Sequence, residues 1–283
     1  MNYKILEDVY LGSNGLIFDK NKEILSLNRY DKFVHVNKNF DDYIIEELYL
    51  DEYVDMTHYY RFWPFAHRYD CLSRLRHIED LIHKDTHFII GGNSKFHPIR
   101  FDEECKLFGI NNKIHHRVSN TLFKIKKLIY PLWLNSESPV QFTFESFEYC
   151  RNKYINMFED KEEKYKLFLT RTNIKRGLIN YEEIHDFLKE KGFIIVNGSE
   201  DFHTIVNYFY NAEIIVGLHG GLFSNMIFCR KPKKIIEIFS DKYNNGCFLG
   251  WKKHLDVDFY EQITYKSAPN GNIHIDKNNL KYE

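Results

Sequence analysis

Two arginines and a histidine follow apolar runs in the second half of the sequence. Arg171 comes directly after "KLFLT", Arg176 follows it closely, and His219 stands between two apolar runs in "IIVGLHGGLFSNMIF". Guanidinium groups hold phosphate oxygens in a forked, two-point geometry. A glycine-rich turn between a strand and a helix presents backbone N–H groups, and the helix dipole favours an anion there. The pattern predicts a phosphate-binding site; a tight turn in which His219 bonds locally is the alternative.

A carboxylate interrupts the apolar run "KKIIEIFS", where Glu237 stands inside a predicted strand. Buried strands rarely keep an unpaired carboxylate, because burying a charge without partners is costly. We therefore expect Glu237 near a strand end, where it accepts hydrogen bonds. Ribose hydroxyls and an internal salt bridge are its two candidate partners. For Arg171 and Arg176, the alternative to phosphate binding is an exposed position on the surface.

The second half of the chain alternates between strand and helix patterns. Strands are predicted at residues 166–170, 193–196, 213–217 and 234–239, and helices at 180–192, 200–212 and 222–229. In the first of these helices Asn180 is the predicted N-cap, Glu183 follows three residues later, and Gly192 marks the end. Such alternation with short connections predicts an α/β fold, in which helices cover both faces of a parallel sheet.

The first half of the chain is less regular and predicts a smaller α/β unit. Its expected elements are a hairpin of residues 10–19 and 22–28, a helix at 66–84, and strands at 86–92 and 123–133. The polar segment 134–141 is the predicted linker, which divides the chain into domains 1–141 and 142–283. Two facing α/β units form a cleft, and ligands of open parallel sheets bind beyond the carboxyl ends of the strands.

The composition is that of a soluble globular protein, with 43% hydrophobic and 28% charged residues among 283. With 39 basic and 40 acidic residues, the chain has no net charge that would attract nucleic acid or an acidic membrane. The aromatic and basic stretch 58–77 contains rings and arginines that can contact bases and phosphates. Those rings suit sugar faces or a protein core equally well, so no nucleic-acid partner is expected.

Cysteine usage and hydropathy predict a reducing compartment. The chain has five cysteines, an odd number, and no CxxC pair, which indicates buried reduced thiols rather than a disulfide framework or a zinc site. The N-terminal sequence shows no signal-peptide pattern, and no apolar run approaches the roughly 20 residues that span a bilayer. We expect a soluble cytoplasmic protein without a transmembrane segment, which can still work peripherally at a membrane.

Taken together, the motifs of the second half resemble glycosyltransferase family 61. The resemblance lies in "LFLTRTNIKRGLINYEEIHDFLKEKGFIIV" and "NAEIIVGLHGGLFSNMIFCRKPKKIIEI". The family is marked by an arginine at a strand end, a second arginine before an Asn and an acidic residue, an HGA-x-x-(S/T)-N loop, and a Glu-bearing strand. Carried over by position, the donor-side residues are Arg171, Arg176, Asn180, His219, Gly220, Gly221, Ser224, Asn225 and Glu237. Gly221 stands where the family has alanine.

A stretch of the first half, "FAHRYDCLSRL", is similar to the family's His-Trp stretch, in which an acidic residue precedes a Leu-x-Arg-Leu pattern. The resemblance makes Asp70 the candidate catalytic base, with His67 and Arg74 on the acceptor side. Arg68 replaces the tryptophan, His67 lies one residue from the family's position, and the Gln before the helix leading to "NAEIIVG" is absent. An ordinary helix carboxylate that pairs with Arg74 is the alternative for Asp70.

The resemblance implies a GT-B-like fold of two facing Rossmann-like units and an inverting transferase. The second domain would hold a nucleotide sugar, with UDP-xylose and UDP-GlcNAc first among the donors, and the first domain would hold a glycan acceptor. Asp70 would take the proton of the acceptor hydroxyl, and the arginines would stabilise the departing diphosphate without a metal. Transfer of another group, such as pyruvate, and a non-catalytic glycan- or nucleotide-binding module are the alternatives.

A metal-dependent transferase would use a DxD motif after a strand. Asp256 and Asp258 in "LDVDFY" have that spacing. They stand outside the strand–helix alternation, where the pattern predicts a surface strand. No metal cofactor is therefore expected.

Overall fold

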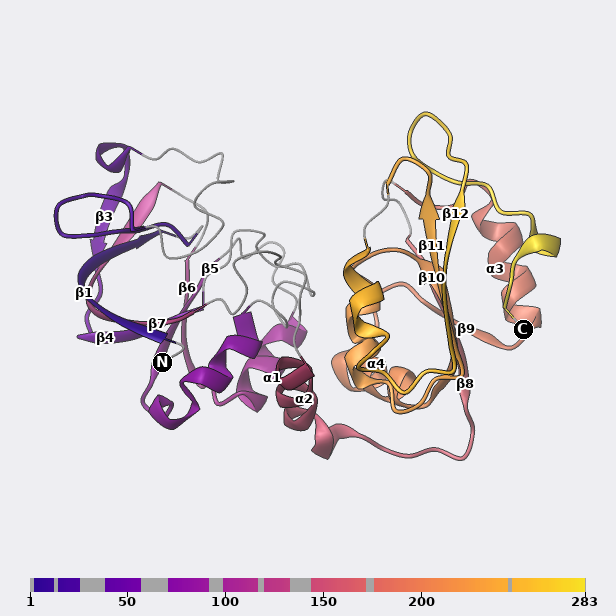
Figure 1. Cartoon of the computed structure of the whole chain (residues 1–283), viewed down its shortest axis with the longest axis horizontal. Helices are drawn as coiled ribbons and strands as arrows, with labels where there is room; N and C mark the ends of the chain where they lie inside the picture. Colours follow the sequence, from indigo (N-terminus) through magenta and orange to yellow (C-terminus); the bar gives the residue numbers. More distant parts are fainter. Residues whose placement is uncertain are drawn as a thin grey trace. The chain divides into compact units, whose positions relative to one another are not determined.

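The structure is a computed structural model of the chain, and it describes residues 3–12, 15–25, 39–56, 71–91, 99–116, 120–132, 144–171, 176–243 and 246–282. The chain divides into two compact units, Met1–Lys153 and Tyr154–Glu283. Each unit contains a sheet and helices, which confirms the α/β class (Figure 1). The predicted boundary after residue 141 and the predicted linker 134–141 lie outside the described residues.

Among the described residues, the second unit holds a five-stranded sheet in the order β12-β11-β10-β8-β9, with every pair parallel. Its strands are β8 (Tyr165–Leu169), β9 (Phe193–Val196), β10 (Ala212–Leu218), β11 (Lys234–Ser240) and β12 (Phe259–Tyr265). The apolar runs predicted as strands form β8 to β11. Most of their side chains are buried and the rest are half-buried, because helices cover the sheet, so these strands lack the polar alternation of a half-exposed sheet.

Helices α3 (Tyr181–Glu190) and α4 (Phe202–Tyr210) cover opposite faces of this sheet, as predicted (Figure 1). Ile184 and Leu188 of α3 are buried in one core with strand residues and with the C-terminal segment. Helix α4 buries an apolar stripe of Phe202, Ile205, Val206 and Phe209. The 3₁₀ helix η8 (Gly221–Phe228) packs against α4 and takes the place of the helix predicted at 222–229.

The two helix starts in this unit use their polar residues differently. Asp201 caps α4, because its Oδ1 accepts from Thr204 N at 2.9 Å. Asn180 occupies the N-cap position of α3 without a side-chain capping bond. Its Nδ2 instead donates to the Ile275 carbonyl at 2.8 Å and its Oδ1 accepts from Ile275 N at 3.2 Å. Asn180 therefore fastens the C-terminal segment to the start of α3.

Strand β12 corrects the prediction that "LDVDFY" lies outside the parallel sheet. It pairs with β11 along its whole length, from Lys234 opposite Phe259 to Ser240 opposite Tyr265. As an edge strand it keeps several residues exposed or half-buried. That mixed burial explains why its sequence lacks the continuous apolar run of the inner strands.

The first unit contains a mixed sheet in the order β2-β1-β7-β4-β5-β6, with β3 also paired to β7. Its elements are β1 (Tyr3–Gly12), β2 (Ile17–Phe18), β3 (Ile44–Glu47), β4 (Glu52–Asp55), β5 (His87–Gly91), β6 (Asn112–His116), β7 (Thr121–Pro131), α1 (Ile99–Leu107) and α2 (Phe144–Lys153). Strand β1 is antiparallel to β2 and β7, and the remaining pairs are parallel. The strands predicted at 86–92 and 123–133 are confirmed as β5 and β7.

The helix predicted over residues 66–84 is not an α-helix where it is described. Two 3₁₀ helices, η4 (Leu72–His77) and η5 (Glu79–Leu81), take its place. Residues 71–75 are all buried, including the polar Ser73 and Arg74. An amphipathic α-helix would turn part of such a run towards solvent, so the buried run accounts for the difference.

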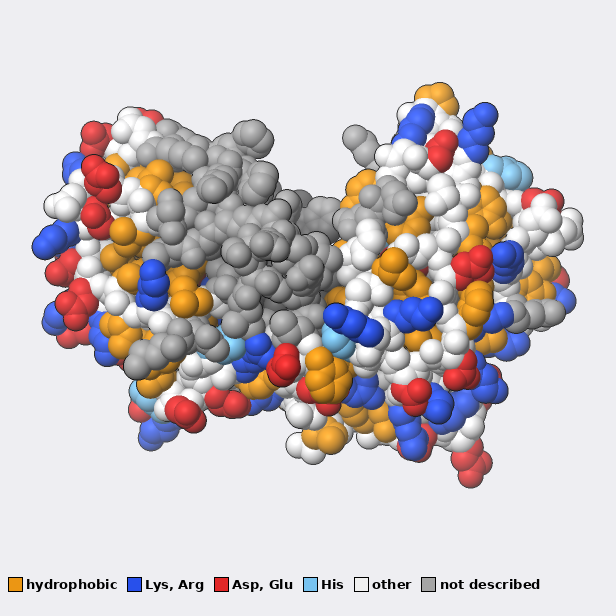
Figure 2. Space-filling model, in the orientation of Figure 1, with side chains coloured by type: hydrophobic (Ala, Val, Ile, Leu, Met, Phe, Trp, Pro, Cys, Tyr) orange, Lys and Arg blue, Asp and Glu red, His pale blue; other side chains and the backbone are white. Residues whose placement is uncertain are grey.

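Basic and acidic side chains are interspersed over the visible described surface of both units (Figure 2). All five cysteines are free and buried, which confirms the expected buried thiols; burial raises the pKa of the Cys247 thiol to about 12. Within the described residues, no helix has both the length and the apolar character needed to cross a bilayer.

Candidate functional site

The predicted phosphate-binding residues of the second unit gather where neighbouring strands end. Arg171 follows β8 and His219 follows β10, and these two strands are adjacent. From β8 the chain runs outward to β9 and then returns to the other side of β8 as β10. The connections after β8 and β10 therefore leave in opposite directions, and such a switch point opens a crevice at the carboxyl edge of a sheet. Arg171 Nη1 donates to the His219 carbonyl at 2.8 Å, which joins the two sides.

Two glycines allow the backbone to pass closely at this edge. A Cβ on Gly217 would lie 2.4 Å from Leu169 Cβ, because Gly217 lies directly opposite Leu169 where β10 pairs with β8. A Cβ on Gly220 would lie 2.7 Å from Arg171 Nη1. Gly217 is therefore required by the pairing of β10 with β8, whereas a side chain at position 220 would have to displace the Arg171 guanidinium.

The arginines keep buried N–H groups without a partner. Within the described part of the chain, neither Arg171 Nε nor Arg176 Nη1 has a hydrogen-bond partner. Burial lowers the pKa of Arg171, and the nearby positive charge of Arg176 lowers that pKa further. A buried donor left without a partner is costly. An anion between the two guanidinium groups would satisfy both donors and relieve the repulsion between the charges.

Arg176 is held in an unusual backbone conformation. Its φ is +70°, in the left-handed region, which costs a non-glycine residue roughly 1–2 kcal/mol. The next residue, Gly177, donates its N–H to Asn272 Oδ1 at 3.1 Å, so the C-terminal segment fixes this turn. The guanidinium lies over the ring of Tyr243, 3.9 Å from its centroid. The role of Tyr243 was not predicted from the sequence. The only sequence feature that could have indicated it is an aromatic residue soon after the end of β11.

His219 is paired with Glu237 in the interior. His219 Nδ1 lies 2.5 Å from Glu237 Oε1, and the two residues are 7% and 0% exposed. The other carboxylate oxygen, Oε2, accepts from Tyr260 Oη at 2.7 Å and from Gln262 Nε2 at 2.8 Å. Both oxygens of Glu237 are thus engaged within the protein. The structure shows the internal pairing that was the alternative to ribose contact.

Strand β12 supplies two partners that sequence reasoning missed. Tyr260 and Gln262 lie on it at alternate positions, on the side of Glu237. Burial and the Glu237 carboxylate raise the pKa of Tyr260, so its hydroxyl stays a donor. Recognising these residues requires knowing that β12 pairs with β11.

The Glu237 carboxylate also orients the imidazole. It favours a proton on His219 Nδ1, and the ring stacks on Phe239 with centroids 4.5 Å apart. The ring centroids of Tyr243 and Phe248 lie 5.4 Å and 5.6 Å from that of His219. His219 Nε2 makes no hydrogen bond to a described residue. This nitrogen is therefore the group that the arrangement leaves for a ligand.

Ser224 and Asn225 lie inside the turn that follows His219. Both are in η8 and are 0% and 3% exposed. Asn225 Nδ2 donates to the Leu222 carbonyl at 2.9 Å, which closes the turn on itself. In this structure these residues shape the loop that carries Gly220 and Gly221.

The acceptor-side candidates fall in a part of the chain that is only partly described. Asp70 and His67 lie outside the described residues. Arg74 is 3% exposed, its Nη1 donates to the Pro131 carbonyl at 3.0 Å, and it lies 3.7 Å from the Asp55 carboxylate. Arg74 therefore ties η4 to the ends of β4 and β7 through internal contacts.

The DxD residues lie at the opposite edge of the sheet from the arginines. Asp256 and Asp258 precede the first residue of β12, which pairs with the first residue of β11. Asp256 forms an exposed ion pair with Lys231 at 3.2 Å. Among the described residues, no group of three His, Cys, Asp or Glu side chains is placed to hold a metal ion.

The chain was compared with protein families and with curated proteins. A family model described as Glycosyltransferase 61 matches residues 65–236, more than half of the chain. The matched range includes Arg171, Arg176 and the turn that contains His219, and it ends one residue before Glu237. A search of curated proteins finds no match.

Proposed function

The chain belongs to glycosyltransferase family 61, and from this premise we propose that it is an inverting enzyme that transfers a sugar from a UDP-sugar to a glycan hydroxyl. UDP-xylose and UDP-GlcNAc are the donors we expect first. The family membership makes the chain a glycosyltransferase. The donor, the stereochemistry and the residue roles below belong to the proposal.

The observation that carries the proposal is the pair of buried, unpartnered N–H groups on Arg171 and Arg176. They lie at the switch point of a parallel sheet, which is where such sheets bind nucleotides. A diphosphate offers several anionic oxygens, enough to accept from both guanidinium groups and, when the imidazole has a proton on Nε2 as well as on Nδ1, from His219. The charge repulsion between the arginines would then favour the loaded state.

The arrangement suits a reaction in which negative charge develops on the leaving group. The acceptor oxygen forms a bond to the anomeric carbon as the bond from that carbon to the β-phosphate oxygen breaks. The bonding electron pair leaves with the nucleoside diphosphate, where Arg171, Arg176 and His219 stabilise it. The acceptor proton passes to a carboxylate on the opposite face of the sugar, for which we propose Asp70.

His219 acts on the leaving group in this scheme, and Glu237 acts through His219. The buried carboxylate holds Nδ1 and Phe239 stacks on the ring, so the plane of the imidazole is fixed. A histidine restrained in this way donates from Nε2 when it is protonated. Glu237 holds the imidazole through Nδ1 and is a positioning residue here.

A thermal-shift experiment on the full chain tests the donor site. UDP at about 100 times its Kd should raise the Tm by about 5 °C or more, because a ligand that binds only the folded state stabilises it. Arg171→Ala should abolish the shift. Arg230→Ala is the matched control, because Arg230 is exposed and pairs with Asp160 far from this edge. An undiminished shift in Arg171→Ala would remove this arginine from the site.

A further inference from the structure

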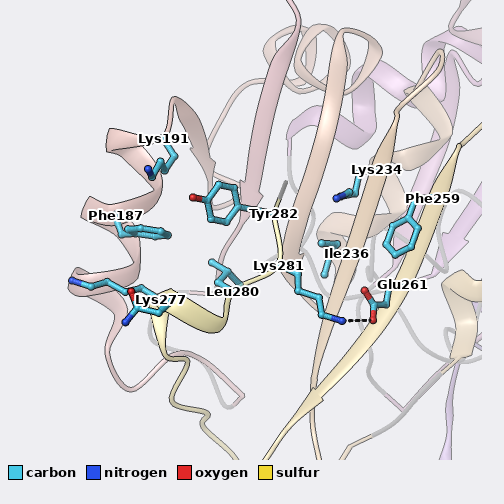
Figure 3. Close-up of a pocket in the computed structure, with 11 residues that line it drawn as sticks. Phe187, Lys191, Lys234, Ile236, Phe259, Glu261, Lys277, Leu280, Lys281 and Tyr282 are labelled. Carbon is cyan, nitrogen blue, oxygen red and sulfur yellow. Dashed lines mark hydrogen bonds and ion pairs between the residues drawn. The ribbon is translucent and has the colours of Figure 1, made fainter.

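A second pocket lies on the α3 face of the second unit, near the start of β11 and β12 (Figure 3). Its volume is about 610 Å³, within the range of small-molecule sites. Lys234 and Phe259, the first residues of β11 and β12, line it. Arg171 and His219 follow the opposite ends of the strands, so this pocket is separate from the candidate donor site.

The pocket combines an apolar floor with aromatic walls. Ile236 and Leu280 are 0% and 5% exposed. The rings of Phe187, Phe259 and Tyr282 stand around them, contributed by α3, β12 and the C-terminal segment (Figure 3). Phe259 is 44% exposed, so one large ring of the pocket is offered to solvent.

The charge of the lining is strongly positive. Lys191, Lys234, Lys277 and Lys281 line the pocket together with a single carboxylate, Glu261, so four positive charges less one negative charge leave +3. Two of these lysines are paired with a carboxylate: Lys281 with Glu261 at 3.1 Å, and Lys277 with Glu183 of α3 at 3.7 Å.

The other two lysines are not neutralised. Lys191 and Lys234 form no ion pair with any described residue. Their ammonium groups lie 5.8 Å from the ring centroid of Phe187 and 5.4 Å from that of Phe259, respectively. Two uncompensated cations, one beside the half-buried ring of Phe187 and one beside the exposed ring of Phe259, favour an occupant that has both negative charge and an apolar face.

We propose that this pocket binds an acidic saccharide, whose carboxylates meet Lys191 and Lys234 and whose sugar face packs on Phe259. Asn278, which also lines the pocket, has an amide that can bond sugar hydroxyls. The choice of a saccharide rests on the proposed function, because a glycosyltransferase handles glycan chains. The charge and ring arguments stand without it.

The sugar units of a glycan that are bound in this pocket would not be the ones that react at the donor site. It would tether a longer glycan to the enzyme and raise the local concentration of acceptor ends. The pocket should therefore lower the KM for acidic acceptor chains and leave kcat unchanged.

Calorimetric titration of the full chain with tetragalacturonate, a uronic-acid oligosaccharide, tests the proposal against neutral cellotetraose. Binding of the uronate should weaken about tenfold in Lys191→Ala/Lys234→Ala, a figure of the size expected for two exposed charge pairs. The double variant Lys252→Ala/Lys253→Ala is the matched control, because it removes the same charge from exposed positions elsewhere in the unit. Phe259→Ala should weaken binding severalfold, whereas Leu249→Ala, at another exposed apolar position, should not.

Three results would overturn the proposal: equal weakening in the lysine control, equally strong binding of cellotetraose, and competition between the uronate and UDP. Lys191→Gln/Lys234→Gln, with the side-chain length kept, provides a second variant if the alanine variant does not fold. The UDP-dependent Tm shift is measured on the same samples. Loss of that shift with uronate binding intact would count against the donor site alone, and the reverse would count against this pocket alone.

Discussion

The two ends of the parallel sheet in the second unit carry similar residue types in opposite physical states. Towards the carboxyl end, His219 follows β10 and is bonded to Glu237, which lies in the middle of β11 rather than near its end as predicted, and both residues are buried. At the amino end, the ion pair between Lys231 and Asp256 is exposed, and that between Lys233 and Glu213 joins an exposed lysine to a half-buried carboxylate. Exposed pairs contribute little to stability, because water screens them and their side chains lose entropy.

At the amino end of the sheet water can replace a removed charge partner, whereas at the carboxyl end it cannot. A surface partner can be removed at small cost, because water replaces it. A buried partner cannot, because the groups left behind lose both water and protein contacts. Substitutions at the two ends should therefore differ in size even where they remove the same functional group.

The largest effect is expected for Glu237→Ala. It leaves the donors of His219, Tyr260 and Gln262 without their shared carboxylate, which should lower the free energy of unfolding by about 3–5 kcal/mol. Urea denaturation followed by circular dichroism measures the change. Asp256→Asn at the amino end is the control and should stay within about 0.5 kcal/mol. Similar losses in the two variants would remove the contrast between the two ends.

A large effect on turnover is expected for Arg171→Ala. Removing one positioned donor from a developing oxyanion costs about 100-fold in rate, because the leaving group loses charge stabilisation at the transition state. Initial rates with UDP-xylose and UDP-GlcNAc, measured with a glycan acceptor that the wild type uses, give this loss of rate. Arg230→Ala should turn over normally. A normal rate in Arg171→Ala with a normal UDP shift would place the diphosphate elsewhere.

A smaller effect is expected for Tyr260→Phe. The variant removes one of three donors to Glu237, so stability should fall by about 1.5–3 kcal/mol, the range for hydrogen bonds to charged groups. We also expect kcat to fall severalfold with the donor KM unchanged, since His219 is less firmly held. Thr264→Val, at an exposed position on the same strand, is the control. Equal changes in kcat for the two variants would show that β12 acts only as a structural edge.

The contrast between the two ends also explains which parts could be predicted from the sequence. Strands β8, β10 and β11 were predictable because inner parallel strands are continuous apolar runs. The edge strand β9 was predictable because its sequence, Phe193–Val196, is also a continuous apolar run. Once they are parallel, Arg171 and His219 must meet at one edge, which the structure confirms. The role of Tyr260 was not predictable, because an edge strand has mixed burial and its partner was unknown.

In the first unit, the prediction of structure from sequence failed for the same reason, because the deciding contact is not local in sequence. Arg74 is buried through its bond to the Pro131 carbonyl, 57 positions away in sequence. No local periodicity contains that contact, so the sequence indicated an α-helix where η4 forms. Three assignments stay predictions: the acceptor in residues 1–141, the donor in residues 142–283, and Asp70 as the base.

The smallest effect is expected for Asp256→Asn/Asp258→Asn combined with EDTA. Both carboxylates lie at the amino end, at the opposite edge from Arg171 and His219, so a metal bound there would not reach the diphosphate. Turnover should stay within about twofold of the wild type, with or without chelator, because positioned cationic side chains stabilise the leaving group. The metal-independent assignment would be contradicted if turnover strictly required manganese and if the double variant lost that manganese-dependent turnover. That result would also mean that the amino end takes part in catalysis, which would require the donor to bind across the opposite edge of the sheet.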